Sequence, residues 1–172
     1  DYDVVKDFSP ISLLVREVNV LAVHPSVAVK SVKELIELAK ARPGQLNFST
    51  GAIGGTPHLA SELFKSMAGL NIVHVAYKGS APAVTALISG EVQLIVIDAG
   101  LVMPHVQSGR LRALAVTSAE PSALVPGLPT VAASGLPGYE VIGMTCLFAP
   151  GKPPAATINR LNQVVVRALS RA

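Results

Sequence analysis

The sequence of 172 residues is poor in cysteine and in aromatic residues, and each shortage excludes a class of protein. Its single cysteine, Cys146, cannot form a disulfide within the chain, and no further ligand stands at metal-binding spacing from it. Aromatic residues make up only 4% of the chain, and the 14 lysines and arginines are scattered. Because nucleic-acid binding needs clustered positive charge or stacking aromatic rings, we expect no nucleic-acid partner.

Long hydrophobic runs are also missing. The longest candidate, residues 94–103, is shorter than the roughly 18 residues of a membrane span and contains Asp98, so we expect no insertion into a membrane. No secretory signal is visible at the beginning of the sequence. Half of the residues are hydrophobic nevertheless, and a chain of this length can bury a substantial core.

The motifs of nucleotide binding and of common catalytic sites are absent as well. The sequence has no G-x-x-x-x-G-K-[ST] or G-x-G-x-x-G motif, and no G-x-S-x-G motif of a nucleophilic serine. The histidines form no HxxxH or HExxH pair; they are His24, His58, His74 and His105. We therefore expect no metal, no cofactor and no enzymatic activity.

Apolar strands alternate with amphipathic helices from about residue 20 onward. The pattern predicts strands at 19–24, 45–49, 72–77, 92–98 and 111–117, and helices at 32–41, 57–68, 82–89 and 101–108. Strands that are almost entirely Val, Ile and Leu are typical of sheets covered on both faces. The sequence therefore predicts an α/β fold with a mainly parallel sheet and helices on both faces.

Capping residues support the helix boundaries. Ser31 and Glu34 form the pattern of a capping box at the first helix. At the second helix Thr56 is the expected N-cap, Pro57 the first helical residue and Gly69 the C-terminal glycine.

The two ends of the chain differ from this alternating block. Residues 118–143 are rich in proline and glycine and predict a long surface connection with one helical turn. Strands are expected at 7–15 and 144–150, followed by a helix at 155–170. Nothing near that helix in the sequence is expected to cover its apolar stripe, formed by Ile158, Leu161, Val165 and Leu169.

A glycine-rich turn at residues 47–58, NFSTGAIGGTPH, links the second predicted strand to a helix. Free backbone N–H groups and the positive end of the helix dipole favour anion binding at such a turn, which lies where the strands of an open α/β sheet end. The turn contains Gly51, Gly54 and Gly55 and the hydroxyls of Ser49, Thr50 and Thr56. The alternative interpretation is a tight connection that merely requires positive φ.

Further polar residues should lie at the same edge of the sheet. Tyr77 and Lys78 follow the neighbouring strand, where Lys78 could supply positive charge or remain solvated. Asp98 ends another apolar strand, where it could bind a ligand or cap the next helix. His58 lies in the first turn of the helix after the glycine-rich turn, a position that suits either packing or ligand contact.

Several motifs in a fixed order resemble the Bug family, the periplasmic solute receptors of tripartite tricarboxylate transporters. The resemblance rests on PGQLNFSTGAIGGTPHLASELFKSMAG, IVHVAYKGSAPAVTALISGEVQL, MPHVQSGRLRALAVTS and LPTVAASGLPGYE, and extends through YDVVKDFSPISLL and FAPGKPPAATINRLN to nearly the whole chain. It implies a two-lobed, type II periplasmic-binding-protein-like fold that closes without chemistry on a small carboxylate. That ligand would be a di- or tricarboxylate, an aromatic acid or an acidic amino acid. A periplasmic location and membrane components of the transporter as partners are implied for the full-length protein.

The resemblance also implies which residues hold the carboxylate, through backbone amides, hydroxyls and bound waters. They are Ser49, Thr50, Gly51, Ile53, Gly54, Gly55, Thr56, His58, Tyr77, Lys78 and Asp98. Two features depart from the family pattern: Thr50-Gly51-Ala52 stands where Ser-Ala-Gly is commoner, and Gly55 stands where a second serine is common. The identity of the carboxylate therefore stays open.

Family members are longer, so the chain resembles a second lobe with remnants of the first. We expect residues 1–18 to be such a remnant with a crossover strand, 19–120 to form the ligand-binding second lobe, and 121–172 to form the return connection, strand and helix of the first lobe. The full-length protein is expected to be a monomer. In this chain the stripe on the last helix must be covered locally, be buried in a dimer or swapped arrangement, or stay exposed.

Two other functions are compatible with the same pattern. An effector-sensing domain of a transcriptional regulator shares the two-lobe α/β plan. A small enzyme could use the glycine-rich turn as an oxyanion or phosphate site, although paired carboxylates for acid–base catalysis are scarce.

Overall fold

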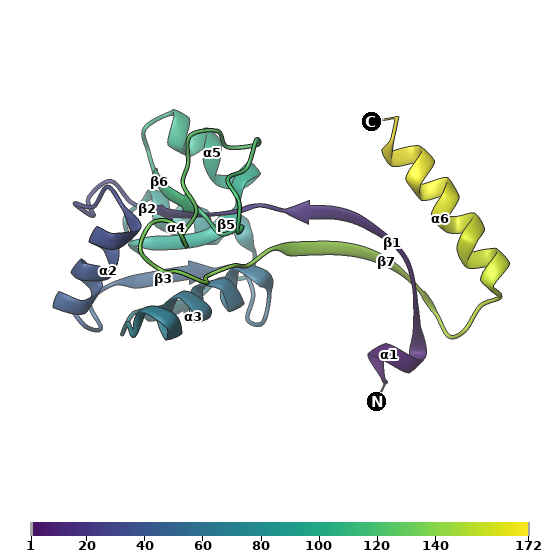
Figure 1. Ribbon diagram of the computed structural model, residues 1–172. Helices are drawn as coiled ribbons and strands as arrows, with labels where there is room; N and C mark the ends of the chain where they lie inside the picture. The colour runs from purple at the N-terminus through teal and green to yellow at the C-terminus, as the bar shows by residue number, and fades with distance from the viewer. Residues whose placement is uncertain (1, 172) are drawn as a thin grey trace. The chain divides into compact units, whose positions relative to one another are not determined.

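The computed structural model describes residues 2–171, which fall into two compact units (Figure 1). The smaller unit combines the two ends of the chain, up to Glu17 and from Gly143 onward, and the larger unit is Val18–Ile142. Among residues 2–171, no helix is both long and apolar enough to span a membrane. Both clusters of buried hydrophobic residues belong entirely to the larger unit.

The larger unit is built on one five-stranded sheet with the order β4-β3-β5-β2-β6. Its strands are β2 (Asn19–Val23), β3 (Asn47–Thr50), β4 (Val73–Ala76), β5 (Leu94–Asp98) and β6 (Arg112–Val116). β3 is parallel to β4 and β5, whereas β2 is antiparallel to both β5 and β6. Four strands therefore share one direction, and the sheet is mixed because β2 opposes them.

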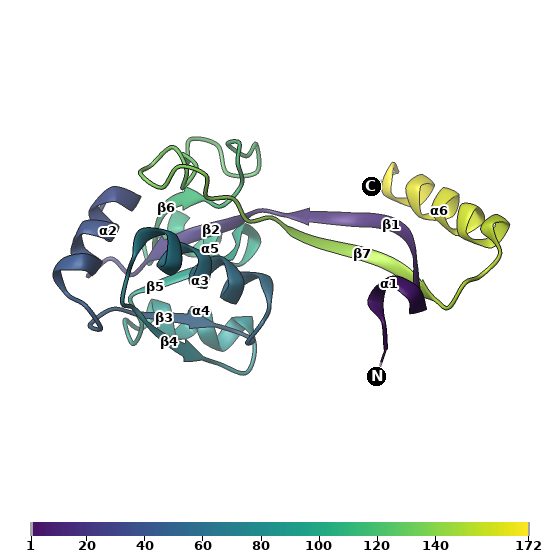
Figure 2. The ribbon, with the colours of Figure 1, turned by 60° about the horizontal axis from the view of Figure 1, so that its bottom comes forward.

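Helices cover both faces of this sheet, as predicted (Figures 1 and 2). The helices are α2 (Val32–Ala41), α3 (Thr56–Ala68), α4 (Ser80–Ile88) and α5 (Ala99–Gln107). Leu35 of α2 and Phe64 of α3 pack in one hydrophobic cluster, and Leu87 of α4 and Val102 of α5 pack in the other. Side chains alternate between the two clusters along β5, because successive residues of a strand point to opposite faces.

Two of the predicted helix caps differ from the observed ones. Ser31 Oγ accepts the Glu34 N–H at 3.2 Å as expected. The Glu34 carboxylate, however, accepts the N–H of Lys30 at 2.8 Å, whereas in a capping box it would accept the N–H of Ser31 itself. α3 begins at Thr56 with Gly55 as its N-cap, so the prediction of Thr56 as N-cap was wrong. Because Gly55 has no side chain, the first turn of α3 is left without a side-chain acceptor.

Residues 118–142 form turns, one of which is the expected single helical turn, since the Ser134 N–H donates to the Thr130 carbonyl at 3.1 Å. The segment is nevertheless tied to the sheet, since Val116 bridges to Thr130 and the Val141 N–H donates to the Thr117 carbonyl at 2.9 Å. Tyr139 is almost fully buried, and its hydroxyl donates to the carbonyl of Ala60 in α3 at 3.0 Å. The connection therefore packs against β6 and α3 of the larger unit.

The smaller unit contains a two-stranded antiparallel ribbon and two helices. β1 (Phe8–Glu17) pairs with β7 (Gly143–Pro150), and the helices are α1 (Val4–Asp7) and α6 (Ala155–Leu169). α6 lies against β1, where Asn162 Nδ2 donates to the Ile11 carbonyl at 2.7 Å. No residue of α6 is buried, and Leu161 on its apolar stripe is 39% exposed. Of the predicted stripe, Ile158 and Val165 are half-buried, whereas Leu161 and Leu169 are exposed.

Candidate binding site

Three helix N-termini gather at one edge of the sheet. The parallel strands β4, β3 and β5 are neighbours, and each leads within a few residues into a helix: α4, α3 and α5 respectively. The N-terminus of a helix carries a partial positive charge and N–H groups without partners in the helix. This edge is therefore suited to an anion.

Two of these three N-termini are open. The N-caps of α3 and α4 are Gly55 and Gly79, and neither helix has a side-chain acceptor for its first amides. α5 differs, because its N-cap Asp98 accepts the Gly100 N–H at 2.8 Å. Asp98 thus caps the following helix, as one of the two sequence interpretations held, while the first amides of α3 and α4 remain available.

The turns before α3 and α4 are bonded to each other. The Tyr77 N–H donates to the Thr50 carbonyl at 2.8 Å, and the Gly79 N–H donates to the Gly51 carbonyl at 2.9 Å. A Cβ on Gly51 would lie 2.5 Å from the backbone nitrogen of Ser80, so only glycine fits here. The close approach brings the starts of α3 and α4 together, as a single carboxylate would require.

The hydroxyls of Ser49 and Thr50 are buried and already have protein partners. Ser49 Oγ donates to the Ala83 carbonyl of α4 at 3.0 Å, and Thr50 Oγ1 shares a 2.6 Å hydrogen bond with His74 Nε2. Since the two residues are consecutive in β3, they point to opposite faces. In this structure both hydroxyls support the walls of the site.

His58 and His74 lie in contact beneath the glycine-rich turn. Their ring centroids are 4.6 Å apart, and His74 also stacks on Phe48 at 4.8 Å. His58 Nδ1 accepts the N–H of Gly54 at 3.3 Å. Burial lowers the pKa of His74 below the usual value for histidine, and the nearby His58 lowers it further. His74 has no place in the site predicted from the sequence, since only strand register puts it beside Thr50.

The remaining predicted residues lie in different surroundings. Ile53 is 75% exposed at the tip of the glycine-rich turn, and Lys78 is exposed after β4. Tyr77 packs against the hydrophobic cluster of α4 and α5, and its hydroxyl has no hydrogen-bond partner among the described residues. Burial raises the pKa of Tyr77, and the nearby Glu91 raises it further. The Tyr77 ring therefore belongs to the α4 face, opposite to the face that carries His74.

Asn19 is a polar residue at this edge that the sequence analysis missed. It is 1% exposed, pairs with Asp98 between β2 and β5, and its Nδ2 has no partner among residues 2–171. Directly paired residues of antiparallel strands place their side chains on the same face. The only sequence signal was an asparagine at the beginning of an otherwise apolar strand.

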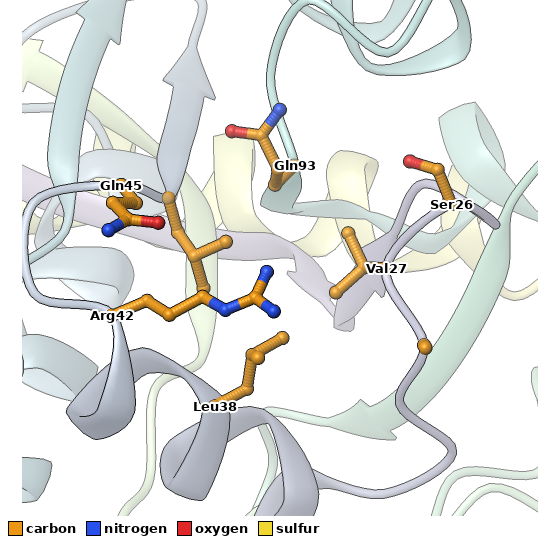
Figure 3. A pocket seen from close by; sticks show the side chains of 8 residues that line it. Ser26, Val27, Leu38, Arg42, Gln45 and Gln93 are labelled. Carbon is orange, nitrogen blue, oxygen red and sulfur yellow. The ribbon is translucent and has the colours of Figure 1, made fainter.

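A separate cavity of about 490 Å³ lies at the opposite edge of the sheet (Figure 3). Arg42 extends across it, next to Leu38 and Val27, and Gln45 and Gln93 add polar groups from the segments that precede β3 and β5. The cavity is thus distinct from the glycine-rich turn. Within the described residues, no cluster of histidine, cysteine, aspartate and glutamate is placed to hold a metal ion.

A mixed α/β sheet whose parallel strands lead into helix N-termini at one edge is the arrangement of a lobe of the periplasmic-binding-protein-like class, in agreement with the structural neighbours. The chain belongs to the tripartite tricarboxylate transporter receptor family: the model described as "Tripartite tricarboxylate transporter family receptor" matches residues 1–172. This confirms the family resemblance read from the sequence motifs.

Individual relatives are similar over nearly the whole chain. Protein BugT of Bordetella pertussis is 36% identical over 168 residues, which is 98% of this chain and 52% of BugT. The structure of an R. palustris protein with adipate has a TM-score of 0.85 at 40% identity, covering 95% of this chain and 55% of that one. MatC from Rhodopseudomonas palustris with bound malate has a TM-score of 0.86 at 28% identity, covering 97% and 57%. The chain spans about half the length of the curated relatives that it matches.

Proposed function

We propose that this chain is the ligand-holding lobe of a solute receptor that captures a small organic carboxylate for a tripartite tricarboxylate transporter. The observation that carries the proposal is the pair of open N-termini, since α3 and α4 begin on turns that are bonded to each other. A carboxylate is the kind of acceptor that these amides lack. Its two oxygens accept several N–H groups, and its charge suits the positive ends of both helices.

The structural neighbours support dicarboxylic acids within this class. One neighbour is described with adipate and another with bound malate, and both ligands have a carboxylate at each end. In our proposal one carboxylate occupies the amides at the start of α3 and α4. The rest of the ligand extends to groups outside this lobe, which is why di- and tricarboxylates, aromatic acids and acidic amino acids share the same anchor.

The predicted site residues take different parts in this proposal. The backbone N–H groups of Thr56 and His58 in α3 and of Ser80 and Ala81 in α4 donate to the carboxylate, and the exposed Lys78 adds positive charge at the rim. Ser49 and Thr50 act through the hydrogen bonds that hold the turn in place. Capture without chemistry fits this arrangement, because in the described chain both hydroxyls are already engaged by protein groups.

The full-length receptor would contain a second lobe and work in the periplasm with the membrane components of the transporter. We assign residues 1–17 and 143–172 to that other lobe, because they form a unit separate from the five-stranded sheet. Their exposed apolar side chains, such as Phe148 and Leu161, are the expected contacts for its missing part.

Amide chemical-shift mapping by NMR tests the proposal on this chain. We expect adipate, succinate or citrate at millimolar concentration to shift the amides of residues 51–56, 58 and 79–81, with weak affinity because one lobe supplies only part of the clamp. Glutamate and benzoate compare the other carboxylate classes, and adipamide is the uncharged control, which should have no effect. Shifts confined to the cavity around Arg42, or none with any acid, would contradict the proposed function.

A further inference from the structure

The two histidines beneath the glycine-rich turn are each bonded to the backbone segment that would hold the anion. His74 Nε2 is 2.6 Å from Oγ1 of Thr50, the residue before the turn, and His58 Nδ1 is 3.3 Å from the amide nitrogen of Gly54 within it. With ring centroids 4.6 Å apart, the two imidazoles affect each other's charge. Both rings are therefore linked by hydrogen bonds to the segment that would hold the anion.

Of the two rings, His74 is the one that can take up a proton without losing its hydrogen bond. The Nδ1 atom of His58 accepts the Gly54 N–H, so protonation there would place two N–H groups against each other. His74 can donate Nε2–H to Thr50 Oγ1 and receive a proton at Nδ1, and this bond persists in the charged form. The Thr50 O–H is then free to donate in another direction.

The surroundings of His74 disfavour its charged form. Phe48 stacks on its ring, and α3 places His58, Glu62 and Lys65 near it. Burial is the main cause of the lowered pKa of His74; His58 and Lys65 lower it further and Glu62 opposes them. Lys65 and Glu62 form an ion pair at 2.9 Å, so their charges largely cancel. The missing element for a charged His74 is a nearby negative group.

We propose that a carboxylate binds to this turn together with one proton, which His74 takes from solvent at Nδ1. The inference rests on the proposed function and adds that affinity increases as the pH falls from about 8 to about 6. The negative ligand favours the imidazolium, and by reciprocity the imidazolium favours the ligand. If binding raises the pKa of His74 by about one unit, from a value below its usual 6.5, the dissociation constant changes about three- to sixfold between pH 8 and pH 6.

The opposite dependence applies to the stability of the empty protein. A histidine whose pKa is lower in the folded state than in the unfolded state binds fewer protons when folded. Its contribution to the free energy of unfolding is therefore present above the unfolded pKa and is lost as the pH falls through the folded pKa. Acidification should thus destabilise the empty protein through His74 while it strengthens carboxylate binding through the same residue.

NMR titration of the whole chain with adipate, whose carboxylates stay largely ionised above about pH 6, tests the inference. We expect the wild-type dissociation constant to be about three- to sixfold lower at pH 6 than at pH 8. His74→Gln keeps an N–H donor for Thr50 but cannot be protonated. The adipate dissociation constant of this variant should therefore differ by less than about twofold between pH 6 and pH 8. His105→Gln is the matched control, since His105 contacts Arg110 near the far end of α5, and it should behave as wild type.

A second measurement is independent of any substitution. Side-chain ¹⁵N spectra of wild-type His74 near pH 7 should change from a neutral to an imidazolium pattern when adipate is added. A pH-independent affinity in the wild type, an unchanged response in His74→Gln, or a His74 that stays neutral with adipate bound would each overturn the inference while leaving the proposed function intact. Absence of any adipate-dependent amide shift would overturn both.

Discussion

Gly51 is the residue at which the two turns of the candidate site come closest. Its carbonyl accepts the Gly79 N–H at 2.9 Å, and an added Cβ would lie 2.5 Å from backbone atoms of Gly79 and Ser80. Contacts this short do not occur at real Cβ atoms, and backbone cannot rotate away as a side chain can. The spacing between the starts of α3 and α4 therefore depends on the absence of one methyl group.

Replacing Gly51 with alanine should separate the two turns. We expect a loss of about 1–3 kcal/mol in the free energy of unfolding, as for other overpacked positions, and at least about tenfold weaker carboxylate binding. Urea denaturation and NMR titration measure the two effects. Gly55→Ala is the matched control, because a Cβ there meets nothing closer than 3.9 Å and φ is −74°. Equal effects of the two substitutions would show that the spacing does not matter.

The sequence predicted which turns form the candidate site, but not how the side chains around those turns are arranged. Glycines and hydroxyls around residues 49–56 marked the turn, and the structure brings it next to the Tyr77–Ser80 turn. That the Thr50 hydroxyl faces His74, or that Asn19 lies opposite Asp98, follows from strand register. Register joins residues far apart in the sequence, so a local pattern cannot reveal it.

At the scale of elements, the three strand-to-helix turns are not equivalent. α3 and α4 start with glycine N-caps and lack a side-chain acceptor, whereas α5 starts with Asp98 and is capped within the chain. A carboxylate that already accepts the Gly100 N–H also places negative charge at that N-terminus. In the proposed function this difference would direct the anion to α3 and α4.

Substitutions of Asp98 should distinguish its capping role from its charge. We expect Asp98→Ala to lower the free energy of unfolding by about 1 kcal/mol, because α5 loses its N-cap acceptor. Asp98→Asn should stay within about 0.5 kcal/mol of wild type, since its amide oxygen can accept the same N–H. Urea denaturation at neutral pH measures both. An Asp98→Asn variant as unstable as Asp98→Ala would mean that the charge, and not the cap, stabilises the helix.

The positions of the elements were largely predictable, and the failures have identifiable causes. Apolar runs and cap residues located the strands and helices of the larger unit to within about three residues, and Gly69 ends α3 in the left-handed conformation as expected. The direction of β2 was not predicted, because a strand buried along its whole length reports burial on both faces and carries no sign of direction. Thr56 was taken as the N-cap because the alternative, Gly55, has no side chain by which to recognise it.

For the whole molecule, the hydrophobic core belongs to one of the two units. Both clusters of buried side chains lie within residues 18–142, while the helix α6 of the other unit has no buried residue. Because burial of apolar surface is the main source of stability, the larger unit should carry its own folding free energy.

A shortened chain consisting of residues 18–142 should therefore unfold cooperatively in urea. We expect Phe64→Ala, in the core, to cost about 3–5 kcal/mol in both the shortened and the whole chain. Leu161→Glu, on the exposed stripe of α6, should change the whole chain by less than about 0.5 kcal/mol. Circular dichroism during urea titration follows all of these. A shortened chain without a cooperative transition would show that the ends are needed for folding.

The pairing of Glu17 with Gly143 in the ribbon of β1 and β7 has a practical consequence. These residues flank the larger unit on both sides, and paired residues in antiparallel strands have Cα atoms only about 5 Å apart. The larger unit thus begins and ends at two neighbouring positions of the antiparallel ribbon, as an inserted domain does. It could be moved into a hairpin loop of a fluorescent protein or an enzyme without changing the order of its own strands. Carboxylate binding in the inserted unit would then be read out as a change in the signal of its host protein.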